Sequence, residues 1–402
     1  MGLQIRPGRA KKRMISDSSI AIVGAGMTRF GYTPERDLRS LAHEAVTAAL
    51  LDAGLAPRDI DCTYVGYCLD LNGQRCVPGQ IVLRDLGIDR NPITRIESAC
   101  ASGSLAVHEA FRAVADGRAE VALAVGLEKM SGASAEATRQ SMAGGADAQL
   151  EGAFGITFPG VFGMAARRHM YRYGTTLDQI TAVTVKARRL AALNPRAHFA
   201  KAVTAGEVFA SRMVADPLRL LHCCPISDGC AAVVISRASR ASKAASRPVL
   251  IRGLAQVSGD FQSLSDLSSF PETTRAAALA CERAGIGIDD IDLYEVHDCF
   301  AIAEIMHYED LGLCDPGAGG ALVASGATEP GGKFPVNPSG GMLGKGHPLG
   351  ASGVAQLVEL AEQLRGHAGA RQVSGAKVGL AHCIGGFTFG APASVAVTIV
   401  SI

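Results

Sequence analysis

The chain of 402 residues contains no tryptophan, and aromatic residues make up only 5% of it. Platforms that stack nucleic-acid bases are built from aromatic rings, so this scarcity argues against one. The formal net charge is only +1, and basic residues form no stripe interleaved with aromatics, as a nucleic-acid-binding surface would require. No apolar run approaches membrane-spanning length. We therefore expect neither nucleic acid nor a membrane as a partner.

The eleven cysteines include no C-x-x-C pair, the spacing that zinc ribbons and fingers use for their ligands. Their odd number, in a chain too large to need covalent cross-links, predicts free thiols in a reducing compartment. Residues 1–13 are basic but lack the apolar core of a signal peptide. We expect a flexible leader over residues 1–17 and a cytoplasmic protein.

The spacing of apolar residues predicts alternating strands and helices. Residues 36–54 have the pattern of an amphipathic helix that ends at a glycine, and residues 61–68 and 120–126 are predicted strands. Residues 19–26 predict a strand followed by a glycine turn. Arg29 stands where a dinucleotide-binding turn has its third glycine, so we do not expect a dinucleotide site there.

Parts of the first half of the chain recur in the second half. Residues 53–61 resemble residues 284–292, and the strands that follow them also match. Cys100-Ala-Ser-Gly enters its helix as His347-Pro-Leu-Gly does. This order predicts two similar α/β units with mainly parallel strand pairing. If a pseudo-twofold axis relates the units, the N-termini of the Cys100 and His347 helices meet near that axis.

The stretch between the two halves breaks the pattern. It is rich in glycine, alanine and serine, and helical spacing follows around residues 162–173 and 177–193. Its cationic residues fit solvated helix faces better than phosphate binding, although both interpretations stay open; they are Arg167, Arg168, Lys186, Arg188 and Arg189. We predict four parts: a leader (residues 1–17), a first half (residues 18–126 with 222–247), an inserted, partly helical loop domain suited to covering a cleft (residues 127–221) and a second half (residues 248–402).

Cys100 is predicted to lie at a turn between a strand, residues 92–96, and a helix. Unpaired backbone N–H groups and the helix dipole favour a thiolate at such a position. Its neighbours Ala99 and Ala101 are small and leave the sulfur room to meet a substrate. The alternative is a small buried thiol, because free cysteine is among the most buried residue types.

Three further segments carry groups that a nucleophilic cysteine needs. His297 and Cys299 leave a predicted strand and enter a helix. His347 lies in a glycine-rich run before a helix, and Cys383 follows another predicted strand. A thiol and an imidazole that converge are the pair that nucleophilic catalysis requires. Each histidine alone is more often structural, and a metal site made from these four residues and Cys100 stays an open alternative without local ligand spacing.

Five motifs, in this order, resemble those of the thiolase family, and within it the sterol-carrier-protein-2-type thiolases. They are Ser98–Gly103 around Cys100, Gly126–Ser131, Cys223–Gly229, His297–Phe300, and Asn337–Gly341 with Gly346–Gly353. The resemblance runs from about residue 18 to the C-terminus. It implies an α/β thiolase fold, duplicated in five layers (αβαβα) with a helical loop-domain insert, and chemistry on coenzyme A thioesters.

The resemblance implies catalytic roles for the first three candidate residues. Cys100 is the implied nucleophile that takes the acyl group. His347 is the implied base that activates it, and it also helps to polarise the thioester carbonyl. His297 stands where the family has the second polar group of an oxyanion hole, which with His347 binds the oxygen of that carbonyl. The backbone N–H groups of Cys100 and of the Gly385–Gly386 turn are implied to form a second hole, around the acyl-enzyme carbonyl.

The acid/base at the substrate α-carbon is implied to be one of two cysteines. Most thiolases use the cysteine of a Cys-x-Gly turn, which here is Cys383. Sterol-carrier-type members are thought to use the cysteine of His-Asp-Cys-Phe, which here is Cys299. We favour Cys383 because its glycine turn is intact, and the choice between the two stays open.

The implied reaction is thiolytic cleavage of a 3-oxoacyl-CoA, or the reverse Claisen condensation, through an acyl-cysteine in lipid metabolism. Acyl-CoA and coenzyme A are the implied substrates, no cofactor or metal is bound permanently, and a homodimer or homotetramer is expected. One alternative is an aldolase, acyltransferase or aromatic acyl-CoA thiolase with a small partner subunit that carries zinc and an OB-type barrel. Another is a non-catalytic acyl-CoA or lipid-binding protein. The presence of Cys100 and His347 argues against the aldolase and the non-catalytic protein.

Overall fold

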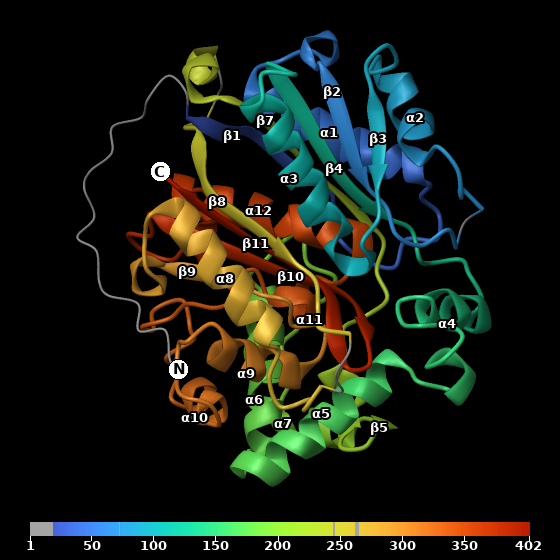
Figure 1. Cartoon of the computed structure of the whole chain (residues 1–402), viewed down its shortest axis with the longest axis vertical. Coiled ribbons are helices and arrows are strands. Elements are labelled where there is room, and N and C mark those ends of the chain that lie inside the picture. The colour runs from blue at the N-terminus through green and yellow to red at the C-terminus, as the bar shows by residue number, and fades with distance from the viewer. Residues whose placement is uncertain (1–18, 72, 244–245, 262–264) are drawn as a thin grey trace.

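The computed structural model describes residues 19–71, 73–243, 246–261 and 265–402, so the predicted leader lies outside the described residues (Figure 1). Within these residues nine strands form one sheet in the order β3-β2-β4-β7-β1-β8-β11-β10-β9. Their bounds are β1 Ile20–Met27, β2 Cys62–Gly66, β3 Ile93–Ile96, β4 Val121–Glu128, β7 Gly229–Arg237, β8 Val249–Val257, β9 Leu293–Glu295, β10 Val378–Thr388 and β11 Ala391–Ser401. None of the described helices is long and apolar enough to cross a membrane.

The sheet consists of two halves with matching strand order. The order β2-β4-β7-β1 in the first half has its counterpart in β9-β10-β11-β8 in the second. The halves meet where β1 pairs with β8, through Ala21 with Leu250 and Ile22 with Val249. The chain also repeats the sequence strand, helix, strand as β1-α1-β2 and β8-α8-β9, with α1 at Leu38–Ala53 and α8 at Pro271–Ala284. The predicted duplication is confirmed.

The prediction of mainly parallel pairing is wrong. In the described part of the chain, only the pairs β2–β3, β2–β4 and β9–β10 are parallel, and the other neighbours in the sheet are antiparallel. A helical crossover returns the chain parallel to the preceding strand. Strand β11, however, follows β10 by a hairpin, and β7 arrives from the long insert, so each runs against its neighbour.

Three apolar cores separate five layers. The first lies between α1, with α2 (Pro78–Leu83), and the outer face of the first half-sheet. The second is formed by α3 (Ser102–Ala115) and α12 (Leu349–Arg365) with both half-sheets. The third lies on the outer face of the second half-sheet, beneath α8. Figure 1 shows α12 between the two groups of strands. The layer order is therefore helix, sheet, helix, sheet, helix, as expected.

Two predicted glycine turns are strands instead. Strand β1 continues through Gly24 and Gly26, where an added Cβ would collide with backbone atoms of α1. Strand β10 likewise continues through Gly385, whose added Cβ would collide with the turn before α3. These glycines permit close approach of a neighbouring backbone rather than a change of direction. Residues 36–54, 92–96 and 120–126 form α1, β3 and β4 as predicted, within a few residues.

The insert contains four helices and a two-stranded ribbon among its described residues. They are α4 Ala135–Ala143, α5 Phe158–Tyr173, α6 Leu177–Ala191, α7 Ala205–Ala210, β5 Met213–Ala215 and β6 Leu218–Arg219. The predicted helices at 162–173 and 177–193 correspond to α5 and α6, whereas the domain boundaries stay a prediction. Two of the cationic residues assigned to solvated faces are buried: Lys186 Nζ lies 2.6 Å from Glu304 Oε1, and the Arg188 guanidinium lies 3.5 Å from the Phe199 ring centroid.

The first turns of α3 and α12 pack against each other through glycines. An added Cβ on Gly103 of α3 would collide with the carbonyl oxygen of Gly350 in α12. An added Cβ on Gly350 would lie 2.5 Å from the Leu127 oxygen and 2.7 Å from the Gly66 oxygen. Real Cβ atoms do not approach this closely, so the two helix ends can meet only because these positions carry no side chain.

We expect Gly103→Ala to lower the free energy of unfolding by about 1–3 kcal/mol, because the added methyl group overpacks this contact. Urea denaturation followed by circular dichroism measures the change. Gly206→Ala is the matched control, since its added Cβ approaches nothing closer than 3.9 Å in the exposed helix α7. Equal stability of both variants would show that the helix ends are not tightly packed.

Candidate active site

Cys100 is the middle residue of a tight turn that leads from β3 into α3. The turn is a short 3-10 helix, Ala99–Ala101, and Ala99 has a φ of 47°, in the left-handed region. The Ala99 N–H donates to Glu97 Oε1 at 2.6 Å, and the Ser98 N–H donates to Ser102 Oγ at 2.8 Å. These bonds hold a backbone conformation that a non-glycine residue rarely adopts. The Cys100 side chain is thereby aimed into the interior, and the residue is only 8% exposed.

His347 lies in the loop between α11 (Gly341–Lys345) and α12, and hydrogen bonds fix its ring. Its backbone N–H donates to Ser227 Oγ at 3.3 Å. Its Nδ1 is 2.8 Å from Ser352 Oγ, and that hydroxyl donates its only proton to the Pro348 carbonyl at 2.9 Å. Nδ1 must therefore carry the ring proton, which leaves the lone pair on Nε2. Burial lowers the pKa of His347 to about 3, so the ring is neutral at physiological pH.

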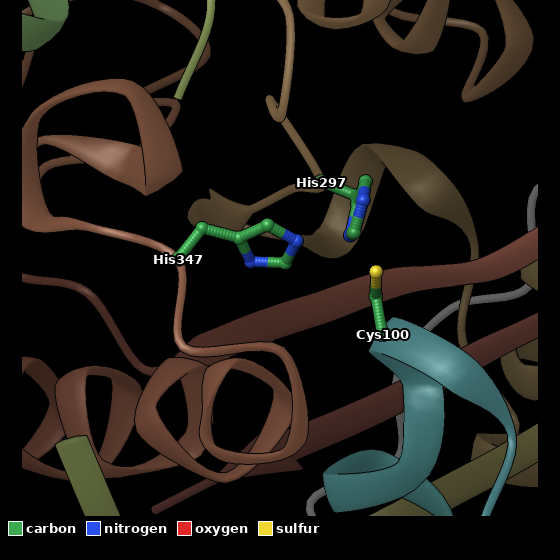
Figure 2. Close-up of side chains that lie close together, drawn as sticks. All are labelled: Cys100, His297 and His347. Atoms are coloured by element: carbon green, nitrogen blue, oxygen red, sulfur yellow. The ribbon is translucent and has the colours of Figure 1, made fainter. Parts of the chain in front are cut away.

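The side chains of Cys100, His297 and His347 converge (Figure 2). One ligand atom from each, the Cys100 sulfur and a ring nitrogen of each histidine, lies within 4.8 Å of the others. The two imidazole centroids are 5.2 Å apart and the rings are nearly perpendicular, at 87°. The two helix ends thus bring a thiol to a neutral imidazole, as the duplication predicts.

Cys383 joins this cluster from β10. Its sulfur lies 3.4 Å from His297 Nδ1 and 3.2 Å from the carbonyl oxygen of Cys100. Burial raises the pKa of the Cys383 thiol to about 12, so the thiol holds its proton at neutral pH. The predicted glycine turn at this cysteine is part of the strand, but the side chain still faces the other candidates.

Cys299 lies in the same buried region. Its carbonyl oxygen accepts the Cys224 N–H at 2.9 Å. Burial, followed by the nearby Cys224 and Cys100 thiols, raises the pKa of Cys299 well above its usual range. All five predicted site residues are therefore buried around one point, although they come from the turn before α3, the connection between β9 and α9 (Ala301–Asp310), the loop before α12, and β10.

The expected thiolate at Cys100 is not supported. Burial, then the neighbouring Cys383 and Cys224, raises the pKa of the Cys100 thiol well above its usual range. The helix N-terminus favours negative charge, but the free energy lost when a thiolate is removed from water exceeds the stabilisation that the helix dipole provides. The resting site therefore holds a neutral thiol beside a neutral imidazole.

No role was predicted for Glu128, which holds three segments next to the site together by hydrogen bonds. This wholly buried carboxyl group accepts N–H groups of Cys68 at 3.2 Å, Leu69 at 3.0 Å and Gly350 at 3.1 Å. It therefore ties the end of β4 to the segment after β2 and to the first turn of α12. Burial raises its pKa to about 8. The Gly126–Ser131 motif contains this residue, but its partners are distant in sequence.

The same three converging atoms could hold a transition metal. Thiolate and imidazole are ligands that zinc accepts, and Cys100, His297 and His347 are the candidate group among the described residues. Nδ1 of His347 is held by Ser352, as the outer nitrogen of a metal-ligating histidine is usually held. The geometry thus fits both a metal and nucleophilic catalysis.

Family models cover most of the chain. Residues 20–239 match the model described as "Thiolase, N-terminal domain", and residues 253–398 match "Thiolase C-terminal domain-like". The acetyl-CoA acetyltransferase of Methanothermobacter thermautotrophicus is 42% identical over 370 residues, which are 91% of this chain and 96% of that protein. Sterol carrier protein 2 of Bos taurus is 38% identical over 384 residues, 91% of this chain and 70% of that protein. The benzoylsuccinyl-CoA thiolase subunit BbsB of Thauera aromatica is 38% identical over 381 residues, 92% of this chain and 95% of that protein.

Two solved structures superpose on nearly the whole chain. The Ltp2-ChsH2(DUF35) aldolase matches with a TM-score of 0.80 and 28% identity, over 96% of this chain and 98% of that one. Human mitochondrial 3-ketoacyl-CoA thiolase matches with a TM-score of 0.74 and 18% identity, over 95% and 98%. The second match supports the fold alone, and the fold predicted from the sequence is confirmed.

We expect alkylation of Cys100 by iodoacetamide to accelerate about tenfold per pH unit between pH 6 and 9, because the reactive thiolate is a small fraction throughout this range. The sign follows from the raised pKa: each unit of increase in pH multiplies that fraction by ten. Mass spectrometry of the Cys100 peptide at timed intervals measures the rate. A rate that is already constant below pH 8 would instead indicate a preformed thiolate–imidazolium pair.

Proposed function

The chain belongs to the thiolase family of acyl-transferring enzymes, and from that premise we propose that it cleaves a 3-oxoacyl-CoA with coenzyme A, or runs the reverse condensation, through an acyl group on Cys100. The observation that carries the proposed route is the convergence of the Cys100 thiol with the neutral His347 imidazole. A neutral pair of this kind supports transfer of the thiol proton at the moment of attack, because Nε2 of His347 holds a free lone pair.

In the first half-reaction the Cys100 sulfur attacks the 3-oxo carbon while its proton passes to His347. The bond between carbons 2 and 3 then breaks. The acyl group stays on Cys100, and the electron pair leaves as the enolate of acetyl-CoA. In the second half-reaction the thiol of coenzyme A gives its proton to the Cys383 thiolate, which is left after that residue protonates the enolate carbon, and attacks the acyl-cysteine. The shortened acyl-CoA is released, and His347 returns its proton to the departing Cys100 sulfur. Coenzyme A is thus a substrate, and we propose no permanently bound cofactor or metal.

We place the hole for the acyl-cysteine oxygen at the backbone N–H groups of Cys100 and of Gly385–Gly386. An added Cβ on Gly385 would collide with the Ser98 carbonyl and would lie 3.0 Å from the Ala101 nitrogen. Only glycine therefore lets β10 lie directly against the Cys100 turn. Removing one such donor typically costs about 3 kcal/mol of transition-state stabilisation.

His297 is the proposed donor to the thioester oxygen of the enolate. Its Nδ1 faces the Cys383 sulfur at 3.4 Å. We propose the tautomer that carries its single proton on Nε2, which is the donor that an oxyanion needs, with the Cys383 sulfur as the partner of Nδ1. Burial lowers the pKa of His297 well below its usual range, which supports a neutral ring.

We propose Cys383, rather than Cys299, as the acid that protonates the enolate carbon. Its thiol is within contact distance of both His297 and the Cys100 backbone. Its raised pKa, about 12, keeps a proton available at neutral pH. The Cys299 thiol also lies near Cys100, so the assignment rests on these two contacts of the Cys383 thiol.

We also propose a cytoplasmic enzyme of lipid metabolism that acts as a homodimer or homotetramer. All eleven cysteines lie in the described residues and are free thiols, which supports a reducing compartment. Strand β3 ends the sheet, and an exposed edge of this kind is suited to pairing with another copy. One structural relative is named an Ltp2-ChsH2(DUF35) aldolase, and the second component in that name supports a further partner subunit, for which we propose the small OB-type subunit.

The aldolase alternative is not favoured for this chain. An aldol cleavage needs no nucleophilic thiol, whereas Cys100 and His347 are both present and converge. A non-catalytic acyl-CoA or lipid-binding protein is likewise not favoured, because it would not require this pair.

Incubation with acetyl-CoA should transfer an acetyl group to Cys100, because the first step forms an acyl-cysteine at that sulfur. The mass of the Cys100 peptide should then increase by about 42 Da. Mass spectrometry of the digested protein measures it, and Cys100→Ala is the control that should carry none. Metal analysis of the same sample distinguishes the zinc interpretation, for which one bound ion per chain is expected. Full thiolysis activity in Cys100→Ala would end the proposal.

Cys383→Ala should still form the acetyl-enzyme but lose condensation and thiolysis by about 10²–10⁴-fold, because the α-carbon proton transfer lacks its acid. The same variant should no longer exchange the α-hydrogens of acetyl-CoA with deuterated water, as followed by NMR. Cys299→Ala is the matched control and should retain both. The reverse pattern would assign the proton transfer to Cys299.

A further inference from the structure

A cavity of about 540 Å³ lies between the insert and the second half of the sheet. Its walls come from α4, from the segment between α4 and α5, from the first turn of α5, from β5 and from the segment that carries Cys223 and Cys224. Phe300 and Phe387, which belong to the second half, complete its lining. The insert and the second half therefore form this space together, and it is open to solvent where Ala135, Arg139 and Arg212 are exposed.

The cavity lies next to the reacting sulfur. Met142 lines it and also packs in the small apolar cluster that contains Cys100 and Leu349. Cys224 lines it as well, and its thiol is among the neighbours that raise the pKa of Cys100. The Phe387 N–H donates to the Gly145 carbonyl at 2.9 Å, which closes the wall beside the Cys100 turn. An acyl group on Cys100 thus has this cavity as its neighbouring space.

Aromatic rings form one wall of the cavity, in a chain with few aromatics. Phe158, Phe300 and Phe387 line it directly. Phe162 stands behind them, stacked on Phe300 with centroids 4.5 Å apart and edge-on to Phe387 at 5.3 Å. Phe270 lies 5.6 Å from Phe387. Such a set of rings offers edge and face contacts to another aromatic ring.

The polar groups that line the cavity are hydrogen-bonded within the protein or exposed to solvent, so they do not require a polar ligand. The Arg139 guanidinium is paired with Glu136 at 2.6 Å, and Glu151 accepts the backbone N–H of Phe389 at 2.9 Å. The Thr138 hydroxyl donates to the Ser134 carbonyl at 3.0 Å. Arg212 is exposed to solvent. A cavity whose buried polar groups are already satisfied favours an apolar occupant.

We propose that this cavity holds the acyl group and that the enzyme prefers a bulky apolar acyl group, such as an aryl group or a chain of six or more carbons, over acetyl. This inference rests on the proposed function, because it assumes that the acyl group is carried on Cys100. Benzene already fills an apolar cavity of about 150 Å³. An acetyl group would therefore leave most of this space without contacts.

The test is thiolysis of a series of 3-oxoacyl-CoA esters that differ only in the acyl group: 3-oxobutanoyl, 3-oxohexanoyl, 3-oxooctanoyl and 3-oxo-3-phenylpropanoyl. We expect kcat/KM to rise about fourfold per added methylene, the equivalent of about 0.8 kcal/mol each. The phenyl ester should exceed the 3-oxobutanoyl ester by about 100-fold or more.

Ala143→Phe, which fills part of the cavity from α4, should lower the ratio of phenyl to 3-oxobutanoyl kcat/KM by at least about tenfold. Ala137→Phe is the matched control on the exposed face of the same helix, and it should leave both the ratio and the basal activity unchanged. A ratio unaffected by Ala143→Phe would place the acyl group elsewhere.

The outcomes separate the two proposals. If the 3-oxobutanoyl ester is the best substrate and kcat/KM falls with size, the preference for bulky acyl groups is wrong while the thiolase reaction stands. If none of the esters acylates Cys100, the proposed function itself fails.

Discussion

The close approach of the first turns of α3 and α12 is the constraint on which the rest of the site depends. Gly103 and Gly350 touch backbone to backbone, and an added Cβ on Gly353 would collide with Ser104. Strand β2 also approaches α3 through a glycine, since an added Cβ on Gly66 would lie 2.6 Å from the Gly103 nitrogen. Each half contributes one helix end, so the duplicated fold produces one site where its two copies meet. Cys100 and His347 face each other because no side chain separates these ends.

Burial then determines the chemistry of the pair. The site lies in the middle of five layers, and the loss of water keeps the Cys100 thiol protonated and His347 neutral. In such surroundings a hydrogen-bond donor aimed at a developing oxyanion is worth more than in water. The same burial is tolerated by Glu128 because three backbone N–H groups satisfy its carboxyl group. Positioning and electrostatics thus have a common origin in the central layer.

The duplicated fold and the meeting of the two helix ends could be predicted from the sequence, because both depend on local residue patterns. The segment that contains Cys100 and the one that contains His347 each carry a turn followed by helical spacing, and their recurrence predicted the meeting of the two helices. Features that depend on distant partners were not predictable. Gly24 looks like a turn until α1 is packed on β1. The antiparallel course of β7 follows from the path of the insert, and the protonated Cys100 follows from layers that close over it. Glu128 has partners on two other elements, so no local spacing marks it.

The most direct test of this account is a double-mutant cycle on the rate of acetyl transfer from acetyl-CoA to Cys100, measured by quenched-flow mass spectrometry. The cycle combines Gly350→Ala, which separates the helix ends, with His347→Ala, which removes the proposed base. If the glycine contact acts by bringing His347 to Cys100, Gly350→Ala slows acylation in the wild-type background but has no further effect in His347→Ala. Independent, multiplicative losses would contradict it, because they would mean that the glycine contact and the thiol–imidazole pair serve separate purposes.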